Sequence, residues 1–182
     1  MGLNIHYPYF VETGAHATDR PRECSTCFSR SQRTRFREYL SQAALPAMEM
    51  SLSWLDAGEP LSINVSGVAI EQFLGDEHDA ADILVQLLRH KAVEILGQTY
   101  YRSVAGLFSE AGEFTSQVSR HAELMEGLSG KRPEVFENTE FVFNSELTNA
   151  LSTLGFAALY SEADESILPV LNPNYVYSCN DL

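Results

Sequence analysis

Glu140 is the residue of this sequence whose setting is most typical of carboxylate chemistry. It stands in the octapeptide FENTEFVF, residues 136–143, where polar and apolar side chains alternate after a brief strand pattern. Asn138 and Thr139 can hold the carboxylate ionised by hydrogen bonding, and an ionised carboxylate at a strand end can act as a nucleophile or a base. The alternative is a loop carboxylate near the amino end of the next helix, where negative charge is favoured.

Two adjacent tyrosines are the next candidates, and their type indicates binding rather than proton transfer. Tyr100, Tyr101 and Arg102 follow Gly97 just beyond the apolar run Val93–Leu96, which predicts a strand. Aromatic side chains at a strand end can form a stacking wall for a sugar, whose C–H faces are apolar. The alternative is a pair of tyrosines that pack a loop.

His6 lies in the peptide His6-Tyr7-Pro8-Tyr9, at the expected end of the first strand. A neutral imidazole at this place can hydrogen-bond a hydroxyl group of a ligand. The alternative is a structural histidine whose ring nitrogens are satisfied inside the protein. From the residues by themselves, both roles stay open.

Cys24 and Cys27 have the two-residue spacing of a zinc or redox motif. Cys179 is remote and His16 would add only one further ligand, so the four ligands of a zinc site are not present. A redox motif also requires a strand–helix context, whereas these cysteines lie in a predicted loop. The sequence therefore predicts no metal site.

Alternating strands and helices must position these residues. The predicted strands, which follow a short apolar and aromatic start at Ile5–Tyr9, are Leu61–Val65, Val93–Leu96, Val135–Phe136 and Phe156–Tyr160. The predicted helices are Arg33–Ala57, which Pro46 should kink or split, Val68–Leu74, Ala80–Arg89, Phe114–Leu128 and Asn144–Leu154. This order indicates an α/β fold with a parallel sheet covered by helices, in which functional residues gather at the carboxyl ends of the strands.

Composition narrows the class of partner. Twelve basic and twenty-five acidic residues give the 182-residue chain a net charge of −13, which argues against a nucleic-acid partner and against adsorption to an anionic membrane. No apolar run approaches the roughly 20 residues of a membrane span. The amino terminus has no pattern of a secretory signal, so we expect a cytoplasmic location.

The predicted sheet is expected to be incomplete. Four or five strands are too few to close a barrel, and no helical pattern follows the last apolar segment. An open sheet would expose a hydrogen-bonding edge. We therefore expect residues 1–182 to be the front part of a longer protein.

Several motifs in this order resemble the N-terminal catalytic region of glycoside hydrolase family 57, in particular its α-amylase-like branch. The resemblance extends from about His6 to Tyr177. His6-Tyr7-Pro8 is similar to the family's His-Gln-Pro motif, and the last of the similar segments is NPNYVY at 172–177. Between them, the similar segments are INVSGVAIEQF at 63–73, VEILGQTYYRS at 93–103 and FENTEFVF at 136–143.

The resemblance implies a partial (β/α)7-type barrel with parallel strands, truncated before closure. It implies an α-1,4-glucan substrate, handled by retaining hydrolysis or 4-α-glucanotransfer, and no metal or organic cofactor. Glu140 would be the catalytic nucleophile; His6, Tyr100, Tyr101 and Arg102 would bind the substrate. Tyr7 stands where the family has Gln and Arg102 where it has His. The family's general acid lies downstream of Leu182, so the isolated chain is expected to be inactive.

Two other classes of protein are compatible with parts of the pattern. A non-catalytic glucan-binding or interaction protein could have inherited the same fold. A metal-dependent deacetylase on a similar barrel would need paired histidine ligands, and no His-x-x-x-His spacing is present. The oligomeric state cannot be predicted from the sequence.

Overall fold

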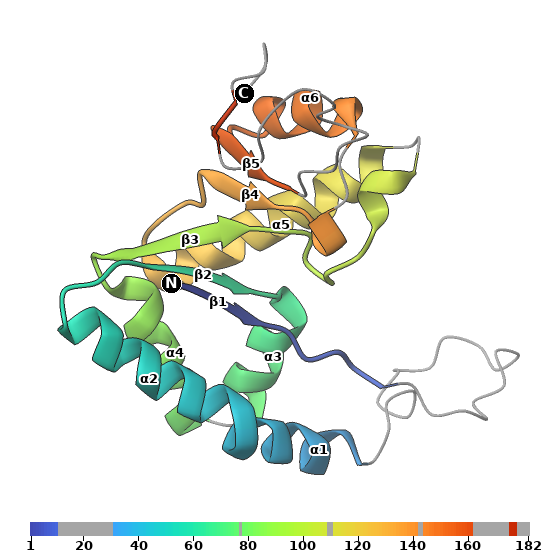
Figure 1. Cartoon of the computed structure of the whole chain (residues 1–182). Coiled ribbons are helices and arrows are strands. Elements are labelled where there is room, and N and C mark those ends of the chain that lie inside the picture. Colours follow the sequence, from blue (N-terminus) through green and yellow to red (C-terminus); the bar gives the residue numbers. More distant parts are fainter. Residues whose placement is uncertain (11–30, 77, 109–110, 142–143, 162–174, 178–182) are drawn as a thin grey trace, which may run out of the picture.

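Five parallel strands form one sheet in a computed structural model that describes residues 1–10, 31–76, 78–108, 111–141, 144–161 and 175–177 (Figure 1). The strands are β1 (Gly2–Ile5), β2 (Leu61–Val65), β3 (Val93–Gly97), β4 (Val135–Glu137) and β5 (Ala158–Tyr160). Their spatial order is their order along the chain, and each pairs in parallel with the next. The order never reverses, as in a barrel and unlike a doubly wound sheet.

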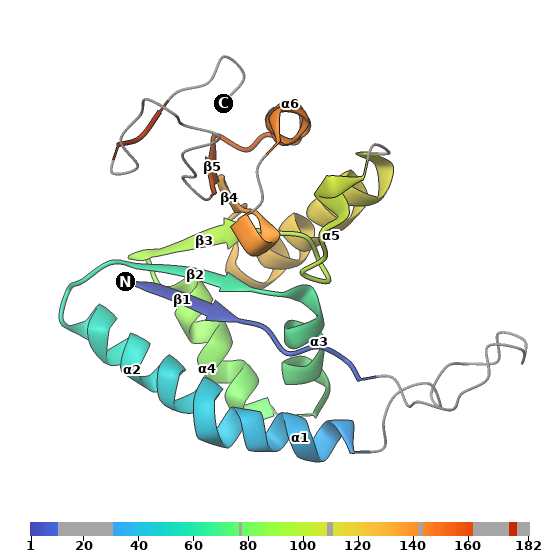
Figure 2. The ribbon, with the colours of Figure 1, turned by 45° about the vertical axis from the view of Figure 1, so that its right-hand side comes forward.

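The helices connect the strands and cover one face of the sheet. The helices are α1 (Gln32–Tyr39), α2 (Leu45–Asp56), α3 (Gly67–Asp76), α4 (His78–Arg89), α5 (Ala111–Ser129) and α6 (Ser145–Thr153). Figures 1 and 2 show α2, α3 and α4 together on one side of β1, β2 and β3. Helix α5 packs against α4 and β3, and α6 packs against α5. The predicted α/β class with a parallel sheet is therefore confirmed.

The long helix predicted over Arg33–Ala57 is divided, as Pro46 suggested, but the break begins before the proline. A π-helical turn at Leu40–Ala44 separates α1 from α2, and Pro46 lies in the first turn of α2. Proline is tolerated there because the first N–H groups of a helix have no partner within it. The wider π turn takes up the change in hydrogen bonding ahead of the ring.

Two apolar clusters hold the layers together. The larger one joins β1, β2 and β3 to the helices beneath them, with fully buried residues such as Ile63, Ile70 and Leu87. The smaller one joins β4 to α5 and α6 around Phe136, whose ring meets Phe114 and Phe156 edge to face. These two clusters pack the helices against the sheet and so hold its strands in place.

Within the described residues, no helix is long and apolar enough to cross a membrane.

Candidate functional site

The residues given catalytic or substrate-binding roles from the sequence all lie at the carboxyl edge of the sheet. His6 directly follows β1, the segment Tyr100–Arg102 follows β3, and Glu140 follows β4. Because all neighbouring strands are parallel, these ends lie at one edge of the sheet. The structure thus brings the predicted residues to the same end of the fold, although they come from three separate segments.

The sheet curves strongly toward the face that the helices leave uncovered. Asn4 on β1 donates its Nδ2 proton to Oε1 of Glu137 on β4 over 2.8 Å. Two strands lie between them, and in a flat sheet three strand spacings of about 4.8 Å would separate their backbones by roughly 14 Å. The bond is therefore possible only because the face that carries both side chains is concave.

Arg102 extends this contact across the concave face. Its Nη1 donates to Oδ1 of Asn4 over 2.6 Å, so one asparagine links a guanidinium to the buried carboxylate of Glu137. The backbone of Arg102 is left-handed, with φ of 53°. The backbone N–H of Arg102 donates to the carbonyl of Thr99 at 2.9 Å. This bond closes a tight turn, which directs the Arg102 side chain toward the concave face.

His6 lies within the electrostatic reach of Arg102. Burial and, secondarily, the positive charge of Arg102 lower the pKa of His6 from its usual 6.5. Its Nδ1 is 2.8 Å from the hydroxyl of Ser66, which also accepts the backbone N–H of Ala69 at the start of α3. His6 is therefore a neutral imidazole at neutral pH, fixed in orientation by the end of the neighbouring strand.

Glu140 sits on a strained turn just beyond β4. Its backbone is left-handed, with φ of 56° and ψ of 18°, and Phe141 follows with φ of 55°. Such conformations cost non-glycine residues about 1–3 kcal/mol each and concentrate at functional sites. The side chain of Glu140 is exposed, and among the described residues no hydrogen bond or ion pair restrains its carboxylate.

The Glu140 turn is tied to the turn that carries Arg102. The hydroxyls of Thr99 and Thr139 are 3.2 Å apart and buried. Thr99 also accepts the N–H of Ser103 at 2.8 Å, and the N–H of Phe141 bonds the carbonyl of Asn138 at 3.0 Å. The two turns therefore form one linked unit, although 38 positions separate Glu140 from Arg102.

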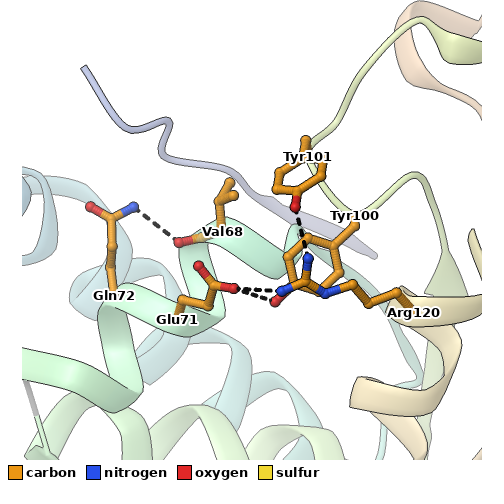
Figure 3. A network of polar contacts seen from close by, with 6 residues as sticks. All are labelled: Val68, Glu71, Gln72, Tyr100, Tyr101 and Arg120. Carbon is orange, nitrogen blue, oxygen red and sulfur yellow. Dashed lines mark hydrogen bonds and ion pairs between the residues drawn. The ribbon is translucent and has the colours of Figure 1, made fainter. Parts of the chain in front are cut away.

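Tyr100 and Tyr101 point toward the helical side of the edge (Figure 3). Tyr100 is buried, and its hydroxyl donates to Glu71 on α3 over 2.5 Å. Burial, followed by this bond to a carboxylate, raises the pKa of Tyr100 to about 12. Tyr101 stays 46% exposed, and its hydroxyl oxygen accepts a hydrogen bond of 2.7 Å from Nη1 of Arg120. Of the two alternatives for this pair, burial favours packing for Tyr100, whereas Tyr101 keeps an accessible ring.

In the part of the chain that the structure describes, no three His, Cys, Asp or Glu side chains gather closely enough to hold a metal ion. His16, Cys24, Cys27 and Cys179 lie outside the described residues.

Comparison with known proteins decides the family. The model of glycosyl hydrolase family 57 matches residues 2–182. The chain belongs to this family. A curated relative, "Putative alpha-amylase" of Methanocaldococcus jannaschii, is 29% identical over 147 residues, or 80% of the chain. The chain spans 32% of the length of that relative.

Solved structures of two enzymes share the fold. A 4-α-glucanotransferase from Thermococcus litoralis superposes with a TM-score of 0.66 at 19% identity, over 87% of this chain and 21% of that protein. A family 57 branching enzyme from Thermococcus kodakaraensis superposes with a TM-score of 0.62 at 13% identity, over 87% of this chain and 38% of that protein. The resemblance stated from the motifs is thereby confirmed at the level of family and fold.

The concave face contains two polar residues that the sequence reasoning did not single out. Asn4 and Glu137 bridge the concave face, yet Glu137 was considered only as part of FENTEFVF and Asn4 lay ahead of the first predicted apolar segment. The signal that could have identified Glu137 was alternation: Val135 and Glu137 share one face of β4, opposite the buried Phe136.

Two buried polar atoms, Asn64 Oδ1 and Gln98 Nε2, have no hydrogen-bond partner among the described residues.

Proposed function

We propose that this family 57 chain carries the nucleophile of a retaining enzyme acting on α-1,4-glucans, and that Glu140 is that nucleophile. The observation that carries the proposal is the placement of Glu140: an exposed carboxylate on a left-handed turn at the carboxyl edge of a curved parallel sheet. The names of the relatives, an amylase, a glucanotransferase and a branching enzyme, support the substrate class.

In the proposed reaction, the Glu140 carboxylate attacks the anomeric carbon while the glycosidic C–O bond breaks. A glycosyl ester forms on Glu140, and the leaving oxygen takes a proton from a second carboxyl group. Water, or a hydroxyl of another sugar, then loses its proton to that group, attacks the anomeric carbon and releases Glu140. The proposal covers both hydrolysis and transfer because the two reactions share this ester and differ in the acceptor.

The second carboxyl group is proposed to come from outside residues 1–182, where the resemblance to the family places the general acid. A glucan has a poor leaving group, so protonation is needed for its departure. We therefore expect the 182-residue chain by itself to turn over no glucan. It is proposed to form the N-terminal part of a catalytic barrel that acts in the cytoplasm.

Substrate-binding roles for His6, Arg102, Tyr100 and Tyr101 belong to the same proposal. Arg102 is supported by its contact with Asn4 on the concave face, where its remaining N–H groups can meet sugar hydroxyls. His6 is supported by its neutral state beside Arg102, which leaves a ring nitrogen for a neutral hydroxyl. A buried Tyr100 can act by holding its neighbour, whereas Tyr101 has an accessible ring on the helical side of the edge, away from the concave face.

The test uses a substrate that needs no acid. A 5-fluoro-α-glucosyl fluoride loses fluoride without protonation, and its ring fluorine slows release of the enzyme-bound ester. Incubation with the 182-residue chain, followed by peptide mass spectrometry, should give a mass increase of one fluoroglucosyl group on Glu140. The same chain with Glu140→Gln should give none.

Glu137→Gln is the matched control, because it changes a neighbouring carboxylate and keeps an oxygen that can accept from Asn4. We expect labelling of Glu140 to persist in this variant. Labelling of Glu137 instead, or labelling that survives Glu140→Gln, would remove Glu140 from the role. Glucan binding without any labelling of the chain or of a longer form would favour a non-catalytic glucan-binding protein.

A further inference from the structure

A second hollow lies at the carboxyl edge, on the helical side rather than on the concave face. It encloses about 640 Å³ and is lined by Pro8, Tyr9, Val68, Glu71, Tyr101 and Arg120. We call it the outer hollow. Tyr101 and Arg102 are neighbours in sequence, but Tyr101 contacts Arg120 on the helical side, whereas Arg102 contacts Asn4 on the concave face. The outer hollow is therefore separate from the contacts around Glu137.

The wall of the outer hollow is held by a network centred on Arg120 (Figure 3). Its guanidinium carbon lies 3.9 Å from the ring centroid of Tyr100. One of its nitrogens donates to the hydroxyl of Tyr101 at 2.7 Å, and another forms an ion pair with Glu71 at 3.2 Å. Glu71 also accepts the Tyr100 hydroxyl. Three side chains, Glu71 of α3, Arg120 of α5 and Tyr100 beyond β3, thus hold Tyr101 in one orientation before any ligand binds.

The chemistry of the outer hollow fits a neutral ligand with both apolar and hydroxyl-bearing faces. Tyr101 offers an exposed aromatic ring, Pro8 adds exposed apolar surface, and the largely buried Val68 also lines the hollow. Glu71 and Arg120 neutralise each other, yet their side chains stay 39% and 53% exposed, so oxygen and N–H groups remain free for hydroxyls. An anionic ligand would gain little from a neutralised arginine and would meet a chain of net charge −13.

We propose that the outer hollow is an accessory binding site for a glucosyl segment of an α-glucan. A sugar ring would stack on Tyr101 through its C–H face, while its hydroxyls bond Glu71 and Arg120. The choice of an α-glucan rests on the proposed function. A polymer held at this edge stays near the concave face, which raises its effective concentration there without any new contact to the reacting sugar.

The test is calorimetric titration of the 182-residue chain with maltoheptaose. Tyr101→Ala should weaken binding about tenfold, since an aromatic contact is lost from an exposed position where folding is not at risk. Tyr101→Phe keeps the ring and should bind nearly as well as the original chain. Trp54→Ala removes another exposed aromatic, which bonds the carbonyl of Pro60 ahead of β2 at the opposite edge, and should leave the affinity unchanged.

Three results would overturn the proposal. One is no binding of maltoheptaose at millimolar concentration; the second is equal affinity in Tyr101→Ala and the original chain. The third is that Arg102→Ala abolishes binding while Tyr101→Ala binds as well as the original chain, which would put the sugar on the concave face. None of these results decides whether Glu140 is labelled by the fluoroglucosyl fluoride, so the accessory site and the proposed catalysis can fail independently.

Discussion

Asn4 and Glu137 share a hydrogen bond of 2.8 Å although β2 and β3 lie between their strands. The bond fixes the curvature of the sheet at its carboxyl end, where Arg102 joins the same asparagine. Curvature of this kind turns a row of strand ends into an enclosed face. It also provides the buried side chain of Glu137 with a hydrogen-bond donor, since Asn4 reaches one of its oxygens from the opposite side of the concave face.

Removal of the donor should therefore be costly. Asn4→Ala leaves the buried Glu137 carboxylate without its hydrogen bond, and we expect a loss of about 1–3 kcal/mol in the free energy of unfolding. Urea denaturation measures it. Glu137→Gln keeps an acceptor for Asn4 and should cost less than Asn4→Ala. Equal stability of Asn4→Ala and the original chain would show that the bond does not hold the curvature.

The close approach of α3 to the tyrosine segment gives a second prediction. A Cβ added at Gly67 would lie 2.6 Å from the ring of Tyr100, which is buried and anchored to Glu71. Gly67→Ala should destabilise the protein by about 1–3 kcal/mol, because the ring has no free space to move into.

Gly75→Ala is the matched control for this substitution, because it lies in the same helix with nothing within 4 Å of the added carbon. Alanine there should raise stability by a few tenths to about 1 kcal/mol, through helix propensity. Thermal unfolding of the two variants side by side measures the difference. A Gly67→Ala variant as stable as Gly75→Ala would contradict the packing around Tyr100.

The strained turn gives a third prediction, in which stability and function oppose each other. Glu140→Gly should raise the free energy of unfolding by up to about 1 kcal/mol, since glycine adopts a φ of 56° without strain. The same variant should lose all labelling by the fluoroglucosyl fluoride. Glu134→Gly, at an exposed glutamate whose φ is not positive, should be neutral or destabilising. A destabilised Glu140→Gly would argue against strain at this residue.

The strand and helix patterns could be predicted because each depends on a few neighbouring residues. Leu61–Val65 has the predicted bounds, since apolar residues alternate with Ser62 and Asn64 between Pro60 and the Ser66-Gly67 pair. The first strand lies earlier than the apolar start at Ile5–Tyr9 suggested, because Gly2–Ile5 pairs residue by residue with β2. Local pattern could not show this, since the register is set by the partner strand.

The contacts of the candidate site depend on distant residues, and sequence reasoning reached them only in part. The brief strand predicted at Val135–Phe136 is present as β4, which ends at Glu137, but no local pattern showed that the chain turns left-handed at Glu140. The contact of Thr99 with Thr139 follows from the pairing of β3 with β4, whereas that of Asn4 with Glu137 follows from sheet curvature. No spacing in the sequence encodes that curvature, because it depends on contacts such as Asn4–Glu137 between residues far apart in the sequence.

His121 gives the last prediction, which concerns pH. This fully buried imidazole on α5 lies with Nε2 2.9 Å from the carbonyl of Val65, and its Nδ1 accepts the N–H of Gln98 at 3.4 Å. The ring is therefore neutral with its proton on Nε2, and burial lowers its pKa to about 4 from 6.5. Between these two values the unfolded chain binds more protons than the folded one, so stability must fall as pH falls through this window.

The contribution of His121 to the free energy of unfolding is constant above pH 6.5. By about pH 4 this contribution has fallen by as much as about 3 kcal/mol. Urea midpoints measured from pH 7.5 down to pH 5 should decline in the original chain. In His121→Gln, a neutral side chain removes this titration, so the decline should be shallower even though the variant is less stable at pH 7.5. His6 has a lowered pKa of the same sign, and His6→Gln reports its smaller share. An unchanged slope in His121→Gln would mean that the buried imidazole is not the group that titrates.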